Sequence, residues 1–115
     1  MLANMKTIKQ QCLLENLAAE DIVHTAEMLK QLAHPKRLKI IDLLNTATKL
    51  PVSKIAEFLE LTQSATSQHL TQMRRIGLLN CERQGKTVWY FIADRRPIAL
   101  LNCICNCCEN QKEKK

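Results

Sequence analysis

The stretch that decides the fold reads LTQSATSQHLTQMRRIGLL and occupies residues 61–79. Thr66, Leu70 and Met73 recur at the spacing of one helix face, which predicts a helix over residues 63–76 with these side chains inward. Gly77 stands where helices commonly end in a left-handed residue. The outward face then carries only hydroxyl and amide side chains: Gln63, Ser64, Ser67, Gln68 and Thr71.

A shorter helix precedes this one. Ile55, Ala56 and Leu59 predict it, with Ser53 as its N-cap, and residues 60–62 form the turn between the two helices. Two short helices joined in this way form a helix-turn-helix pattern. Small hydroxyl and amide side chains at the start of the second helix can approach base edges in the DNA major groove, so this pattern predicts a DNA reader.

A basic hairpin follows the two helices. Strands are predicted over residues 78–83 and 87–93, with Gln84-Gly85-Lys86 as the turn between them. Arg83 and Lys86 flank the glycine, which suits this wing to phosphate or minor-groove contact.

The rest of the chain is predicted to be helical. Residues 5–33 contain neither Gly nor Pro and form one helix, or two with a break near residues 17–21. Pro35 suits the first turn of the next helix. A last helix runs from a cap at Asp94 to about Cys108.

The composition bounds the architecture. A length of 115 residues fits one domain, predicted over residues 1–111 with a charged tail at residues 112–115. Two glycines, three prolines and 3% aromatic residues argue against an all-β fold. The predicted class is mainly α (α+β): a winged helix-turn-helix with five or six helices and a two-stranded β-hairpin.

The net charge of +6 is concentrated in the middle of the chain. Residues 36–96 carry eleven Lys and Arg against five Asp and Glu, a net +6, which favours a polyanion such as nucleic acid as partner. The longest apolar run, residues 88–93, is too short for a membrane span, and residues 1–11 lack the apolar core of a signal peptide, so a cytoplasmic location without membrane contact is expected. No nucleophile elbow, Gly-rich phosphate loop or HExxH motif occurs, which argues against an enzyme.

Four cysteines fall within six residues near the C-terminus. Cys103 and Cys107 share one helix face, and Cys105 and Cys108 share another. Clustered thiolates bind soft ions; three suit trigonal arsenic and four suit a tetrahedral ion. A redox or persulfide switch and a cytosolic metal-buffering protein stay open as alternatives. Cys81 is expected to be a small, buried hydrophobe.

Several segments resemble the ArsR/SmtB family of repressors. The family patterns LADPxRL, LSQSxVSxHL, L(R/K)xxGLV and xGxxxxY are similar to LAHPKRL at 32–38, LTQSATSQHL at 61–70, RRIGLL at 74–79 and QGKTVWY at 84–90. The match covers about residues 28–94, with His34 in place of Asp and Thr66 in place of Val.

The resemblance implies a homodimer that binds operator DNA when unliganded and releases it when an inducer binds. The family dimerises through its first and last helices. DNA contacts carried over by position, together with the basic wing, are Gln63, Ser64, Ser67, Gln68, His69, Arg83 and Lys86. Arg37 and Lys54 are further candidates for phosphate contact.

Most sensing sites of the family are missing. The CVC arsenic motif falls on residues 51–53, the last-helix Asp/His site lacks histidine, and the cysteine of persulfide-sensing members falls on Asp42. The C-terminal cluster is similar to members that sense arsenite or cadmium with C-terminal cysteines. The expected inducer is therefore As(III), or else Cd(II) or Pb(II), with no ion needed for folding; its expected ligands are Cys103, Cys107 and either Cys108 or Cys12.

Overall fold

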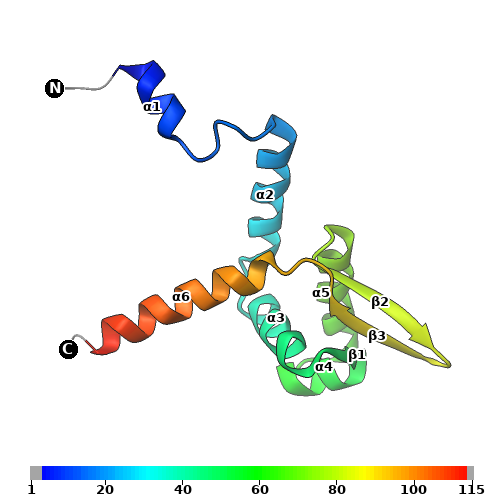
Figure 1. Ribbon diagram of the computed structural model, residues 1–115. Helices are drawn as coiled ribbons and strands as arrows, with labels where there is room; N and C mark the ends of the chain where they lie inside the picture. The colour runs from blue at the N-terminus through cyan, green and yellow to red at the C-terminus, as the bar shows by residue number, and fades with distance from the viewer. Residues whose placement is uncertain (1–3, 114–115) are drawn as a thin grey trace.

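The computed structural model describes residues 4–113, with side-chain surroundings as far as residue 110. These residues form six helices and three strands (Figure 1), in the order α1 (Met5–Gln11), α2 (Ala19–Leu32), α3 (Pro35–Ala47), β1 (Lys49–Pro51), α4 (Val52–Leu59), α5 (Gln63–Arg75), β2 (Leu79–Gln84), β3 (Thr87–Ile92) and α6 (Arg96–Glu113). The predicted class, mainly α with a winged helix-turn-helix, is confirmed.

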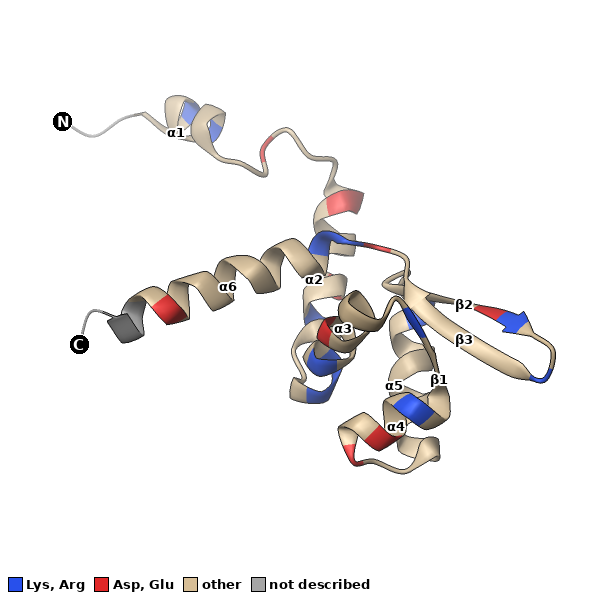
Figure 2. Ribbon diagram, turned by 60° about the horizontal axis from the view of Figure 1, so that its bottom comes forward, with Lys and Arg blue, Asp and Glu red and all other residues tan. Residues whose placement is uncertain are grey.

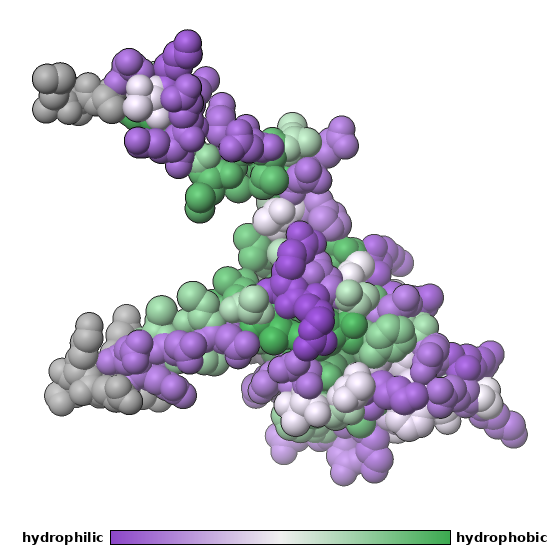
Figure 3. All heavy atoms as spheres, viewed as in Figure 1, coloured by the Kyte–Doolittle hydropathy of each residue, from purple (hydrophilic) through white to green (hydrophobic). Residues whose placement is uncertain are grey.

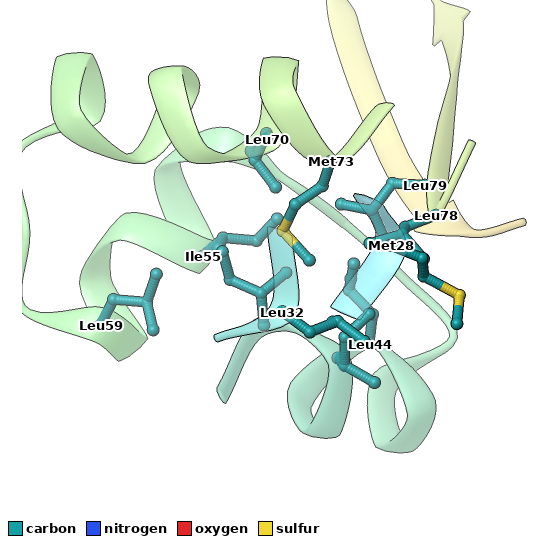
Figure 4. Close-up of a cluster of buried hydrophobic side chains, with 11 residues drawn as sticks. Met28, Leu32, Leu44, Ile55, Leu59, Leu70, Met73, Leu78 and Leu79 are labelled. Carbon is teal, nitrogen blue, oxygen red and sulfur yellow. The ribbon is translucent and has the colours of Figure 1, made fainter. Parts of the chain in front are cut away.

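The core lies where α2, α3, α4 and α5 meet the sheet, and Figure 4 shows its side chains converging from these elements. Ile55, Leu70 and Met73 are each fully buried. Each large apolar side chain buried in this way contributes about 1.5–3 kcal/mol. Thr66 is also fully buried, and its hydroxyl donates a hydrogen bond to the Thr62 carbonyl at 2.9 Å. The predicted inward face of the 63–76 helix is therefore confirmed.

The sheet has three strands in the order β1-β3-β2, all antiparallel, where the sequence predicted a two-stranded hairpin. Leu50 on β1 lies opposite Tyr90 on β3, and Leu79 on β2 lies opposite Ile92. The prediction missed β1 because three residues show no alternation. Pro51 fits this position because β1 is an edge strand, where a missing N–H is tolerated.

Side-chain hydrogen bonds cap the starts of α3 and α5. His34 Nδ1 accepts from the Lys36 amide at 3.1 Å, capping α3, and Pro35 occupies its first turn. Thr62 Oγ1 accepts from the Ala65 amide at 3.1 Å at the start of α5. Gly77, with φ +88°, ends α5 in the left-handed region as predicted.

Some element boundaries differ from prediction. The break in the N-terminal helical region lies at residues 12–18, N-terminal to most of the predicted break. Pro51, not Ser53, is the N-cap of α4, because the chain enters the helix directly from β1. The predicted tail at residues 112–115 lies largely outside the described residues: α6 is assigned to Glu113, and Lys114 and Lys115 are not described.

Two arms leave the body, and both views show them projecting into open space (Figures 1 and 2). We define the arms as α1 with its linker to α2, residues 5–18, and α6. The described chain accordingly extends 64 × 42 × 21 Å. No helix within residues 4–113 is both long and apolar enough to cross a bilayer.

Apolar side chains stay uncovered on the arms and on the outer face of α2. Figure 3 shows them along one flank of α6 and along the linker between α1 and α2. They include Leu13, Leu14, Leu17, Val23, Leu29, Leu100 and Ile104, each 39–93% exposed. Large exposed apolar side chains grouped in this way are typical of protein–protein contacts.

Candidate nucleic-acid interface

The outer face of α5 is open to solvent. Gln63, Ser64, Gln68 and Thr71 are exposed and Ser67 is half-buried, so the predicted polar face points outward as expected. Residues 63–75 contain no Asp or Glu, and the helix N-terminus adds partial positive charge. This face can therefore approach an anion without repulsion from its own helix.

A shallow hollow of about 560 Å³ lies along this face. It is lined by Arg37, Ser64, Ser67, Gln68, His69, Thr71 and Gln72. Every lining side chain can donate a hydrogen bond. Phosphate oxygens and base edges both accept such bonds, so the hollow is chemically suited to nucleic acid.

His69 lies in the wall of this hollow, in contact with α3. Arg37 Nε donates to His69 Nδ1 at 3.1 Å, and the His34 ring meets the His69 ring edge-on with centroids 4.7 Å apart. Because Nδ1 accepts, the neutral imidazole carries its proton on Nε2. Burial, then the charges of Arg37 and His34, hold the pKa of His69 below its usual value.

Arg37 is a connecting residue between helices. Its Nη1 donates to the Gln31 carbonyl at 3.2 Å and also to the Gln31 side-chain oxygen. The guanidinium therefore ties α3 to α2 and to α5 at once. Lys54 instead pairs with Glu57 at 3.6 Å on the exposed surface of α4. Sequence alone made Arg37 a candidate for phosphate contact but could not predict these bonds, because its partner His69 is 32 residues away.

The β2–β3 hairpin reaches out beside α5, and Figure 2 shows basic residues towards its far end. Arg83 and Lys86 are exposed there, and Gly85 turns the chain with φ +64°. The nearby carboxylate of Glu82 is held by Lys49 Nζ at 3.3 Å. None of the salt bridges among the described residues engages Arg83 or Lys86, so both charges stay available to a ligand.

The cysteines are all free, and those of α6 are all exposed: Cys103, Cys105, Cys107 and Cys108. No three His, Cys, Asp or Glu side chains in the described part of the chain are close enough together to hold a metal ion. Cys12, the fourth predicted ligand, is exposed at the end of α1, which Figures 1 and 2 both show apart from α6. One copy of the chain therefore does not assemble the predicted ligand set.

Cys81 lies half-buried on β2, opposite Tyr90. Burial and the neighbouring Cys81 raise the pKa of Tyr90. This thiol belongs to the sheet packing and lies outside the α6 cluster.

Comparison with known proteins agrees with this architecture. The sequence profile described as "Bacterial regulatory protein, arsR family" matches residues 34–80. The transcriptional repressor PagR of Bacillus anthracis is 42% identical over 94 residues, covering 79% of this chain and 91% of PagR. The cadmium resistance transcriptional regulatory protein CadC of Listeria innocua is 31% identical over 85 residues, covering 74% of this chain and 71% of CadC.

Solved structures agree as well. The crystal structure of PagR superimposes with a TM-score of 0.69 at 36% identity, covering 76% of this chain and 99% of PagR. The homodimeric winged helix-turn-helix DNA-binding domain Mb0332 of Mycobacterium bovis superimposes with a TM-score of 0.74 at 25% identity, covering 91% of this chain and 94% of that domain. With its open polar helix, its basic wing and these relatives, the chain belongs to the ArsR family of DNA-binding bacterial transcriptional regulators.

Proposed function

We propose that this chain is a repressor that binds operator DNA as a homodimer and releases it when a thiophilic ion binds cysteine thiolates of α6. The proposed DNA binding rests on the outer face of α5, which carries no carboxylate. It lies beside the β2–β3 hairpin, whose Arg83 and Lys86 take part in none of the salt bridges among the described residues. In this arrangement α5 enters the major groove, where Gln63, Ser64, Ser67 and Gln68 reach bases or phosphates. Arg83 and Lys86 neutralise phosphates beside it.

The arms supply the dimer contact in this proposal. Their uncovered apolar side chains need a partner, and a second copy offers the same surface around a two-fold axis. Mb0332, which superimposes on 91% of this chain, is a homodimeric domain. A dimer also provides two copies of α5 for the two half-sites of an operator.

The cysteines divide between two faces of α6. At about 100° of turn per residue, Cys103 and Cys107 point about 40° apart, in the same half of the helix as Leu100 and Ile104. These two apolar side chains are 39% and 50% exposed, so Cys103 and Cys107 lie on the face that a partner would cover.

Cys105 points the other way. It lines a hollow of about 240 Å³ against α3, together with Leu38, Lys39 and Asp42. Cys108 lies about 100° around the helix from Cys107, which makes it a poorer third ligand than sequence spacing suggested. The third thiolate is better supplied by a second copy, from its Cys12 or its Cys103.

The donor set fits a soft ion. Thiolates select As(III), Cd(II), Pb(II) or Zn(II) over hard cations. As(III) is the first choice, because three thiolates complete its shell, and Cd(II) or Pb(II) is the second. The name of CadC, a cadmium resistance regulator, supports a metal inducer for this chain. Bonds of about 2.3 Å between ion and sulfur would draw the arms together and change the spacing of the two α5 helices.

The test uses a duplex selected from a random pool by its affinity for the protein. We expect fluorescence anisotropy to report tight binding by the ion-free dimer and release on addition of As(III) or Cd(II), with Mg(II) inert. Release requires the ion to favour the non-binding state by a few kcal/mol. DNA binding that no soft ion weakens would contradict the proposed ion sensing. Absence of DNA binding would contradict both the proposed operator binding and the proposed release.

A thiol-based redox repressor is the second candidate, because all four α6 cysteines are free and exposed. Cys103 and Cys107 are one helical turn apart, and a disulfide between them requires local deformation of α6, because Cβ atoms about 5–6 Å apart in a regular helix must approach to about 4 Å. A two-electron oxidant such as diamide would take two hydrogens from the thiols and leave the S–S bond. This candidate predicts release by diamide without any ion, reversed by dithiothreitol. The ion-sensing proposal predicts release under reducing conditions.

A further inference from the structure

A line of polar contacts crosses three helices and ends on the DNA-facing one. It begins at Glu27 on α2, whose carboxylate accepts from Gln31 Nε2 at 3.2 Å. Gln31 accepts in turn from Arg37 on α3, and Arg37 Nε donates to His69 Nδ1 on α5 at 3.1 Å. The orientation of His69 is therefore set from outside its own helix.

Two basic residues, Arg37 and His34, are packed against His69. Arg37 faces it from α3, and His34 faces it edge-on at 4.7 Å from the cap of the same helix. Lys36 lies next to them, with its ammonium bonded to the Leu59 carbonyl of α4 at 2.8 Å.

No salt bridge within the described residues brings a carboxylate to His69. The nearest carboxylate along the line of contacts is Glu27, which is separated from the imidazole by Gln31 and Arg37. Burial, then electrostatic interaction with Arg37 and His34, lowers the pKa of His69, so the free protein holds this imidazole neutral near neutral pH.

Protonation would rearrange these contacts. An imidazolium carries hydrogens on both nitrogens, so His69 could no longer accept from Arg37, and the two charges would repel. A phosphodiester in the hollow removes this penalty, because it accepts from both cations. Arg37 and His69 both line that hollow, beside the hydroxyls of Ser64 and Ser67.

We propose that phosphate binding in this hollow is coupled to proton uptake by His69, so that the affinity for duplex DNA rises as the pH falls. The inference rests on the proposed DNA binding and is independent of the ion that releases it. His69 is then a phosphate-contacting residue, and Arg37 and Gln31 are positioning residues that hold its Nδ1 in the neutral state.

The chain is well suited to a test because it has only three histidines. Binding to a random-sequence duplex is measured by anisotropy at fixed ionic strength, from about pH 7.5 to about pH 6, where imidazoles change charge. We expect the wild-type affinity to rise with falling pH, by at most about tenfold per pH unit for each proton taken up per dimer. His69→Asn retains an acceptor for Arg37 but cannot titrate, so its affinity should be independent of pH.

Two matched variants serve as controls. His24→Asn changes an exposed histidine of α2 outside the line of contacts, and His34→Asn keeps a good N-cap for α3. Both should keep the wild-type direction of the pH dependence. The inference is overturned if the wild-type affinity is flat, if His69→Asn keeps the wild-type slope, or if His34→Asn alone abolishes it. DNA binding with flat pH dependence overturns this inference alone, whereas absence of DNA binding at every pH overturns the proposed function as well.

Discussion

The body and the arms of this molecule differ in how far one copy of the chain buries their apolar side chains. The body, from α2 to β3, buries Ile40, Ile41, Leu44 and Leu70 at 0–1% exposure and satisfies its core with one copy of the chain. Helix α1 buries no residue, and the α6 cysteines are all exposed. One copy of the chain therefore completes its own core and presents the polar face of α5, whereas the thiols of α6 and the apolar side chains of the arms stay exposed in that copy.

The largest expected effect is the loss of folding stability when a core side chain is truncated, compared with the same kind of change on an arm. Leu70→Ala removes a fully buried side chain from α5 and should lower the free energy of unfolding by about 2–5 kcal/mol. Leu13→Ala changes a side chain that is 93% exposed, and should cost less than about 0.5 kcal/mol in the dilute monomer. Urea unfolding measures both. Equal losses would show that the linker carries as much folding energy as the body.

A charge on the exposed face of α6 should separate assembly from folding. Ile104→Asp places a carboxylate among apolar side chains and should weaken dimerisation at least about tenfold, or 1.4 kcal/mol. Sedimentation velocity reports the dimer, and circular dichroism should show the body intact. Asn106→Asp adds the same charge elsewhere on α6 and should leave the dimer unchanged. If Ile104→Asp dimerises like wild type, the dimer does not use this face.

Within the body, base reading and phosphate contact should respond differently. Gln68→Ala should cost about 1–3 kcal/mol on the selected duplex and relax preference at one position of each half-site. Lys86→Ala should weaken all sequences about equally and reduce the salt slope by about one. Anisotropy across single-base variants of the duplex distinguishes them. Unchanged affinity and preference in Gln68→Ala would remove α5 as the reading helix.

The smallest expected effect is on the pH dependence of stability. Because the folded state holds the pKa of His69 below its ordinary value of 6.5, the unfolded chain takes up the proton first as the pH falls. The free energy of unfolding should therefore decrease on going from above pH 6.5 towards the folded pKa, and then level off. Urea unfolding of wild type and His69→Asn isolates this contribution. Identical pH profiles of the two proteins would contradict a lowered pKa of His69 in the folded state.

The hydrophobic periodicity of the sequence was sufficient to predict the helices of the body. Thr66, Leu70 and Met73 marked the buried face of α5, and Gly77 marked its end, because each position depends on local spacing and backbone conformation. The sequence pattern did not predict the short strand β1, because Lys49-Leu50-Pro51 becomes a strand only by pairing with β3, about forty residues further along the chain.

The candidate sites depended more on distant contacts. The polar face of α5 followed from helical spacing alone. The bond between Arg37 and His69 joins two segments that no periodicity relates. For the cysteines, spacing gave the shared face of Cys103 and Cys107, but only the packing of α6 on α3 showed that Cys105 points elsewhere.

The most direct test of the account compares the two cysteine faces of α6. Cys103→Ser with Cys107→Ser and, as a matched control, Cys105→Ser with Cys108→Ser are each bound to the selected duplex and titrated with As(III) and Cd(II) under reducing conditions. We predict that both proteins bind DNA like wild type, that the first pair no longer releases it, and that the second pair releases it at the wild-type ion concentration. Release from the Cys103→Ser, Cys107→Ser protein at that concentration would contradict the account.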